Sequence, residues 1–303
     1  MSLAHFVDTE RVIYSIEKES GPILLIVGGM HGNEPASIEA INETFSKLKP
    51  LEHLMNGSVY AIKGNVNALK QDKRFIDTDL NRVWAKDINQ EFLKAQAEYK
   101  EYLEIKNIVD GIKEFQGNRQ FILLDLHTTS SNSLPFILSS NEHRNRRLVI
   151  PIPVPTVLGV EKRIKGTLMN YFNDNKDCGI VFEAGAHLDP NSIKYHSIII
   201  QLILVNAGIL NQSDLEDFEE MVHALYINSK SRQNIFEITY RYGIKSDEKF
   251  KMNPGYFNFK MIEQGEEVAS NQNGPIITPL PGRIFMPLYQ SQGNDGFFIV
   301  KES

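Results

Sequence analysis

Short apolar runs that stop at polar residues recur along the first two-thirds of the chain. Three of them are residues 22–30 (PILLIVGGM), 120–131 (QFILLDLHTTSS) and 179–187 (GIVFEAGAH). A short, continuous apolar run with such an end is typical of a strand that is buried on both faces of a sheet. By the same pattern, further strands are predicted within residues 57–69 (GSVYAIKGNVNAL) and 135–140 (PFILSS).

Segments with helical spacing separate these runs. Residues 33–49 place apolar side chains three and four positions apart, at Ile38, Ile41, Phe45 and Leu48. A second apolar stripe crosses residues 87–115 and predicts a long amphipathic helix, with room for a break, packed on the sheet. Residues 197–205 (SIIIQLILV) are the most apolar run, but they are too short to span a membrane and predict a core helix. Strands that alternate with helices favour an α/β fold with both faces of the sheet covered.

The pattern changes after Asn211. Short β-like runs separated by Gly, Pro and Asn follow, in residues 234–245, 255–269, 274–289 and 295–303. Runs of this kind are typical of a β-rich domain. We therefore predict two domains, an α/β domain in residues 1–211 and a smaller β-rich C-terminal domain in residues 212–303.

The composition narrows the class of protein. The 303 residues are 42% apolar and 23% charged, as in an ordinary globular protein. The net charge is −6 and the basic residues are scattered, which argues against a nucleic-acid-binding stripe or a basic membrane-binding face. The single cysteine, Cys178, excludes an intrachain disulfide framework and a thiolate-rich zinc site. Because no signal-like segment opens the chain, we expect a cytoplasmic protein. Both a monomer and a homo-oligomer are compatible with this composition.

Three of the apolar runs end in residues that can bind a metal or transfer a proton: His31 with Glu34, Asp125 with His127, and Glu183. Open α/β sheets bind ligands beyond the carboxyl ends of their strands. A lone histidine at a strand end is usually structural. Histidine and carboxylate residues at three strand ends, however, favour one shared functional site. Two histidines and one glutamate are a known ligand set for catalytic zinc. We therefore predict that His31, Glu34 and His127 bind zinc.

Two further carboxylates have predicted roles beside this metal. Side chains alternate along a strand, so Asp125 and His127 share a face, and Asp125 can orient the imidazole. A metal-activated water needs a base to remove its proton. Glu183 ends an apolar strand, where a partly desolvated carboxylate next to a cation is suited to proton transfer.

Residues 73–84 (KRFIDTDLNRVW) form a charged segment without regular periodicity. Such a segment is usually a solvated loop when it stands alone. Arginine forks bind carboxylates through two parallel hydrogen bonds, and asparagine can add a donor. Next to a zinc site, Arg74, Asn81 and Arg82 therefore predict a clamp for an anionic substrate.

Four motifs in this order, GGMHGNE, RFIDTDLNR, LLDLHTT and FEAG, resemble the aspartoacylase and succinylglutamate desuccinylase family of zinc-carboxypeptidase-like hydrolases. The resemblance covers the first two-thirds of the chain. It implies one zinc ion per chain, held by His31, Glu34 and His127, with Glu183 as general base and acid. It also implies a carboxypeptidase-like mixed sheet flanked by helices, followed by a β-rich C-terminal domain that narrows the entrance to the site.

The resemblance also assigns roles in substrate binding. It implies that Arg74 polarises the scissile carbonyl and that Asn81 and Arg82 hold a substrate carboxylate. Family members carry a basic residue before the catalytic glutamate, for which Lys165, with Arg163 beside it, is the nearest candidate here. A C-terminal tyrosine used by some members has a loose counterpart in Tyr289. The basic run at residues 143–147 (HRNRR) is expected to be a solvated loop outside the site.

These observations predict a zinc-dependent amidohydrolase (a deacylase) that cleaves an N-acyl amino acid or a similar small carboxylated amide. A zinc carboxypeptidase acting on peptide C-termini is the alternative enzyme, favoured by an open groove and disfavoured by a domain that covers the site. A non-catalytic carboxylate binder is a third possibility, against which Glu183 argues because binding alone needs no base. A deacylase of another acyl compound also stays open.

Overall fold

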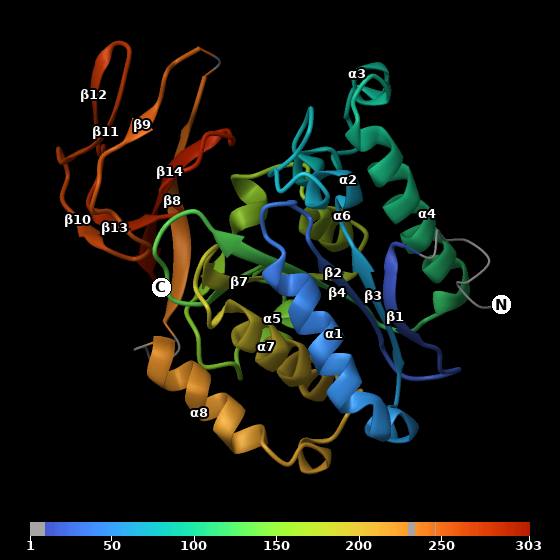
Figure 1. Ribbon diagram of the computed structural model, residues 1–303. Coiled ribbons are helices and arrows are strands. Elements are labelled where there is room, and N and C mark those ends of the chain that lie inside the picture. The colour runs from blue at the N-terminus through green and yellow to red at the C-terminus, as the bar shows by residue number, and fades with distance from the viewer. Residues whose placement is uncertain (1–9, 230–233, 246) are drawn as a thin grey trace.

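A mixed sheet of eleven strands runs through the protein in the computed structural model, which describes residues 10–229, 234–245 and 247–303 (Figure 1). The strand order is β1-β3-β2-β4-β7-β5-β6-β8-β14-β13-β10. These strands are β1 (Val12–Ile16), β2 (Ile23–Gly28), β3 (Ser58–Lys63), β4 (Phe121–Thr129), β5 (Phe136–Ser139), β6 (Thr156–Leu158), β7 (Cys178–Ala186), β8 (Ile235–Gly243), β10 (Met261–Ile262), β13 (Gly282–Phe285) and β14 (Asp295–Glu302). A smaller sheet has the order β12 (Gly274–Ile277), β11 (Glu267–Asn271) and β9 (Lys251–Met252).

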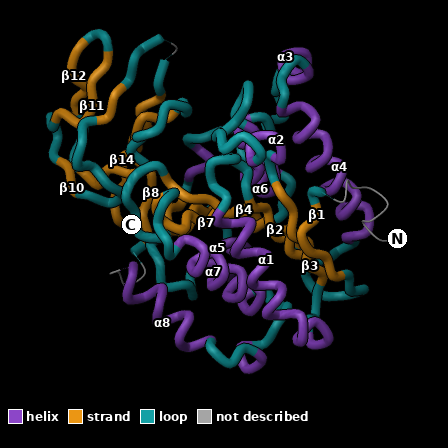
Figure 2. The backbone as a smooth tube through the Cα atoms, viewed as in Figure 1, coloured by secondary structure: helices purple, strands orange, loops and turns teal. Residues whose placement is uncertain are grey.

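Helices cover both faces of the sheet, as the alternation of helix and strand predicts (Figure 2). One face carries α1 (Ala36–Leu48), α5 (His143–Val149), α7 (Ser192–Asn206) and α8 (Phe218–Ser229). The other face carries α3 (Gln90–Lys94), α4 (Glu98–Gln116) and α6 (Leu168–Asp174). Short helical turns complete the described chain: α2 (Val66–Leu69), η2 (Lys49–Leu54), η3 (Leu80–Arg82), η4 (Val160–Lys162) and η5 (Gln212–Asp214).

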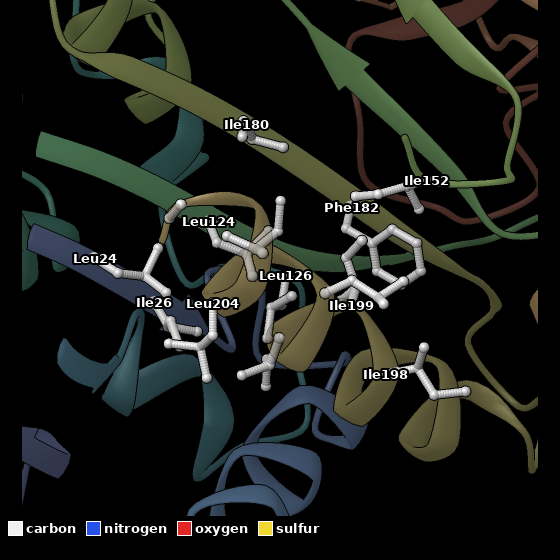
Figure 3. Close-up of a cluster of buried hydrophobic side chains, with 14 of the residues drawn as sticks. Leu24, Ile26, Leu124, Leu126, Ile152, Ile180, Phe182, Ile198, Ile199 and Leu204 are labelled. Atoms are coloured by element: carbon white, nitrogen blue, oxygen red, sulfur yellow. The ribbon is translucent and has the colours of Figure 1, made fainter. Parts of the chain in front are cut away.

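The central strands are apolar on both faces because each face packs on helices. In β2, Leu24 and Ile26 belong to the cluster under α1 and α7, whereas Leu25 and Val27 belong to the cluster under α4. Figure 3 shows the first cluster, in which side chains of β2, β4 and β7 meet Ile199 of α7 and its neighbours. This two-sided burial explains the continuous apolar runs.

Parallel pairing brings three strand ends to one edge of the sheet. Strand β4 lies between β2 and β7 and runs parallel to both, whereas β1 and β5 are antiparallel to their neighbours β3 and β7. The carboxyl ends of β2, β4 and β7 therefore open on the same side. In the register, His127 lies directly beside Glu183.

The long helix that was predicted with room for a break is present in two parts. The stripe across residues 87–115 is divided into α3 and α4, and α4 starts anew where Asp77 Oδ2 accepts the backbone N–H of Ala97 at 2.7 Å. The solvated loop expected at residues 143–147 is wrong, because these residues form most of α5. Arg144 donates hydrogen bonds to backbone carbonyls, and Asn145 is fully buried.

The C-terminal part is a smaller antiparallel β region, which confirms the predicted α/β fold class. The residues just after Asn211 are helical, since η5 and α8 precede the first strand of this region. Strand β8 pairs in parallel with β6, so the large sheet continues from the α/β part into the C-terminal part. The boundary at residue 211 stays a prediction. Among the described residues, no helix is both long enough and apolar enough to cross a lipid bilayer.

Candidate metal centre and active site

Three ligand-type side chains converge at the carboxyl edge of the sheet. His31 and Glu34 lie in the turn between β2 and α1, and His127 lies near the end of β4. The Nδ1 atoms of His31 and His127 are 2.9 and 3.2 Å from the two carboxylate oxygens of Glu34. One ligand atom from each residue lies within 4.8 Å of the others, and all three side chains are buried. The structure thus brings together the three residues that the sequence predicts as zinc ligands.

The turn that carries His31 and Glu34 is held by close backbone packing. Gly29 has a φ of +65°, which glycine adopts at no steric cost. Gly32 packs so closely on α2 that a Cβ atom there would lie 2.1 Å from the carbonyl carbon of Ala68. Ser37 Oγ accepts the backbone N–H of Gly29 at 2.9 Å and donates to the carbonyl of Glu34 at 3.2 Å.

A carboxylate stands behind each imidazole. His31 Nε2 is 3.2 Å from Asp79 Oδ1, and His127 Nε2 is 3.0 Å from Asp125 Oδ2. When Nε2 donates its proton to the carboxylate, Nδ1 keeps a lone pair that faces Glu34 and the other histidine. The expected contact of Asp125 with His127 is confirmed, and Asp79 forms the corresponding contact with His31.

The electrostatics favour positive charge at the centre. Burial would raise the pKa of Glu34, but the neighbouring His31 and His127 hold it well below its usual range. Burial would likewise lower the pKa of His127, yet Asp125 and Glu34 raise it well above the ordinary value. The cause is that three buried carboxylates, those of Glu34, Asp79 and Asp125, surround the two imidazoles and favour positive charge between them.

Glu183 completes the cluster from strand β7. Burial raises its pKa to about 8. Its Oε2 atom is buried and has no hydrogen-bond partner among the residues that the structure describes. A buried, unsatisfied carboxylate oxygen next to a two-histidine, one-carboxylate donor set fits a site made for a cation and a water molecule.

A narrow cavity of about 70 Å³ opens onto this cluster, and Glu183 lines it together with His31, Glu34 and His127. Arg74 and Arg82 come from the charged segment before and within η3, and both line the cavity. The C-terminal β region supplies another part of the wall, including Met286, Gln290 and Asp295.

The sequence of residues 20–205 matches the family model of the succinylglutamate desuccinylase/aspartoacylase catalytic domain. This match covers more than half of the chain. The chain belongs to this family.

Relatives of this family member include two probable aspartoacylases. The one from Acaryochloris marina is 31% identical over 120 residues, which make up 40% of this chain and only 39% of the relative. The one from Prochlorococcus marinus strain MIT 9301 is 26% identical over 283 residues, or 88% of this chain and 87% of the relative. A solved succinylglutamate desuccinylase from Vibrio parahaemolyticus shares the fold, with a TM-score of 0.67, 14% identity, and coverage of 98% of this chain and 90% of that chain.

In this family member, the two predicted clamp arginines contact carboxylates of the site. Arg74 Nη1 is 3.7 Å from Glu34 Oε1, and its Nη2 is 3.1 Å from Asp79 Oδ2. Arg82 Nη2 is 2.9 Å from Asp295 Oδ2, and its Nη1 donates to the backbone carbonyl of Asn81 at 2.8 Å. Both guanidinium groups are therefore oriented by the protein itself.

Other predicted substrate-binding residues lie elsewhere. The Asn81 side chain is buried beside His127, and its Oδ1 accepts the backbone N–H of Leu168 at 2.9 Å. Lys165 is exposed and is not among the described residues that line the cavity. Arg163 is exposed as well, and Tyr289 directs its hydroxyl to the carbonyl of Asn253 at 2.7 Å.

Sequence reasoning missed the contribution of Asp295. It bridges two arginines, because its Oδ1 is 2.6 Å from Arg241 Nε while its Oδ2 contacts Arg82. Asp295 begins the last apolar run of the chain, and nothing in the local pattern there distinguishes it from a solvated strand end. His187 was also missed. Its Nδ1 lies 2.7 Å from the hydroxyl of Thr128, whose backbone N–H donates to Glu34.

Proposed function

We propose that this protein is a zinc-dependent hydrolase that cleaves the amide bond of an N-acyl amino acid or a similar small carboxylated amide. The observation that carries the proposal is the buried His31–Glu34–His127 cluster with the unsatisfied oxygen of Glu183 beside it. Membership of a family of desuccinylases and aspartoacylases supports deacylation as the reaction.

His31, Glu34 and His127 would hold one zinc ion per chain. Two imidazole nitrogens and one carboxylate make three protein ligands, the number typical of catalytic zinc, which keeps a fourth coordination position open. A zinc ion there supplies an activated water and a Lewis acid for the scissile carbonyl. Asp79 and Asp125 keep the two imidazoles in the orientation that binding requires.

Glu183 and Arg74 perform the remaining chemistry. Glu183 takes a proton from the attacking water and passes it to the departing amine, so that the amide and the water together become a carboxylic acid and an amine. Arg74, which lines the cavity next to Glu34, stabilises the negative charge that develops on the carbonyl oxygen.

Arg82 is the proposed contact for a substrate carboxylate, because its guanidinium lines the cavity without touching the three metal ligands in any contact that the described residues show. Asn81 supports the site from beside His127. The exposed position of Lys165 supports no direct contact with substrate.

The small volume of the cavity, about 70 Å³, supports a small substrate over a peptide. The C-terminal β region covers part of the site, with Met286 and Gln290 in the wall of the cavity. A carboxypeptidase would need an open groove for the remainder of its peptide. The names of the relatives above differ, because one refers to an aspartate acyl compound and the other to succinylglutamate, so the acyl group and the amino acid are the first properties to measure.

The test combines metal analysis with a substrate panel. The purified protein should bind about one zinc ion per chain and hydrolyse at least one of a set of N-acetyl, N-succinyl and N-malonyl amino acids. His31→Ala and His127→Ala should each lose the metal, whereas His53→Ala, at an exposed histidine, should keep it. A protein that stays free of zinc after incubation and dialysis, or that hydrolyses none of the panel, would contradict the proposal.

A further inference from the structure

Glu98, the first residue of α4, has a buried carboxylate that binds a distant loop. It is 0% exposed. Its two oxygens accept the backbone N–H groups of Ile76, Asp77 and Thr78 at 2.6, 3.1 and 3.1 Å. A fourth hydrogen bond comes from Asn65 Nδ2 at 3.2 Å.

The loop that Glu98 binds is the charged segment that leads into the active site. Arg74 precedes the three bonded residues and Asp79 follows them directly, so both flank the point of attachment. The loop returns the contact, because Asp77 Oδ2 accepts the backbone N–H of Ala97 at the start of α4. Two carboxylates thus lock the loop and the helix end to each other.

This attachment matters because the loop has little regular structure of its own. Only η3, at its end, has helical hydrogen bonding. Successive N–H groups that converge on one anion form charge-assisted bonds, which fix backbone direction more firmly than bonds between neutral groups. The position of Asp79 in turn determines the orientation of His31 and Arg74, through contacts of 3.2 and 3.1 Å.

We propose that Glu98 is a positioning residue for the active site. Its carboxylate fixes the backbone of residues 76–78 and thereby places Arg74 and Asp79 at the cavity. Glu98 touches neither the cavity nor the proposed metal ligands in the contacts of the described residues, and it acts through the loop. The expected effect on substrate binding rests on the proposed function.

Glu101 provides a matched control on the same helix. It lies one turn further along α4 and is also buried. Its carboxylate accepts the backbone N–H groups of Val66 and Asn67 in α2 and pairs with Arg11, but in the described contacts it does not bind the loop. Glu98→Gln and Glu101→Gln therefore remove similar charges from similar depths, with different segments attached.

The test compares these two variants by hydrogen–deuterium exchange and by steady-state kinetics with an N-acyl amino acid. Glu98→Gln should increase amide exchange in residues 76–78 by about tenfold or more, because the bonds that protect these amides are weakened. It should raise KM by about tenfold while zinc content is retained. Glu101→Gln should lower the melting temperature but leave both the exchange in residues 76–78 and KM within about twofold of wild type.

Wild-type exchange in residues 76–78 of Glu98→Gln, or an equal rise in KM in both variants, would overturn the proposal. If Glu98→Gln does not fold, Glu98→Asp replaces it, because aspartate keeps the charge but reaches the amides less well. The same local increase in exchange is then expected, and its absence overturns the proposal. If the wild-type protein hydrolyses no N-acyl amino acid, the proposed function fails, and the exchange measurement still decides the role of Glu98.

Discussion

At the scale of single residues, the site depends on side chains that make a contact through each of their two polar atoms. His31 and His127 direct Nδ1 to the centre while Nε2 contacts a carboxylate, and Glu34 presents one oxygen to each imidazole. Glu183 differs from them because one of its oxygens is buried without a partner in the described part of the chain. This distinguishes Glu183 from Glu34, whose two oxygens each contact a histidine.

Replacing Glu183 by glutamine should abolish most turnover without releasing the metal. Glutamine keeps the size of the side chain but cannot accept and return a proton. General base catalysis typically contributes about 10²-fold to 10⁴-fold, so kcat should fall by that factor. Metal analysis and steady-state kinetics check this prediction. A variant with near-native kcat would show that the base lies elsewhere.

Arg82→Lys should show whether substrate binding needs the planar guanidinium group at this position or only its positive charge. Lysine retains the positive charge but cannot form the planar fork that binds a carboxylate with two hydrogen bonds. We expect KM for a carboxylated amide to rise about tenfold, since about 1.4 kcal/mol corresponds to one decade. The matching amide with a blocked carboxylate should be hydrolysed as before. Equal losses on both substrates would mean that Arg82 supports the structure of the site and does not bind the carboxylate.

At the scale of elements, the active site is assembled where secondary structure stops. The turn after β2, the end of β4 and the end of β7 meet because three parallel strands finish at one edge of the sheet. The turn after β2 is pressed against α2, which explains its requirement for glycine at position 32. Gly111 in α4 is not packed in this way, because an added Cβ there lies more than 4 Å from the surrounding described atoms.

Gly32→Ala and Gly111→Ala should therefore have opposite effects. The added methyl group at position 32 collides with the backbone of Ala68, so the free energy of unfolding should fall by about 1–3 kcal/mol. The displaced turn should also weaken zinc binding by His31 and Glu34. Gly111→Ala should raise the free energy of unfolding by about 0.4–1 kcal/mol and leave zinc binding unchanged. Urea unfolding and zinc titration measure both effects, and a stable, zinc-binding Gly32→Ala protein would contradict the packing argument.

At the scale of the whole molecule, the C-terminal β region contributes directly to the cavity. The large sheet extends through β8 to β14, which brings Asp295 to Arg82 across 213 positions of sequence. Asp295 is 11% exposed and contacts Arg241 as well, so one carboxylate neutralises part of the charge of two arginines. The C-terminal region thereby places a negative charge beside Arg82 at the cavity.

Asp295→Asn should strengthen the binding of carboxylated substrates. Asparagine removes the negative charge that competes for Arg82, so KM for a carboxylated amide should fall about threefold to tenfold. The amide with a blocked carboxylate should show little change. Glu302→Gln, at an exposed position of the same strand, serves as the control and should leave KM unchanged. A rise in KM for both substrates would show that Asp295 is needed to hold Arg82 in place.

Much of the fold and part of the site could be predicted from local patterns. Continuous apolar runs predicted β2, β4, β7 and α7, which are largely buried on all sides, and helical spacing predicted α1, which is buried on one face. The same patterns failed at residues 143–147, where a charged segment is helical because Leu148 and Val149 anchor the end of α5 in the core. Charge alone does not show which side of a helix is buried.

What the sequence by itself determined is the chemistry offered at each strand end. His31 and Glu34 are three residues apart in one turn, and Asp125 and His127 are two residues apart in one strand, so their relative positions follow from backbone geometry. Only the tertiary structure decided which distant groups meet them. Glu98 binds residues 76–78, Asn81 binds the backbone of Leu168, and Asp295 contacts Arg82. Such contacts depend on how sheet register and packing bring remote segments together, and a pattern of neighbouring residues carries no information about that.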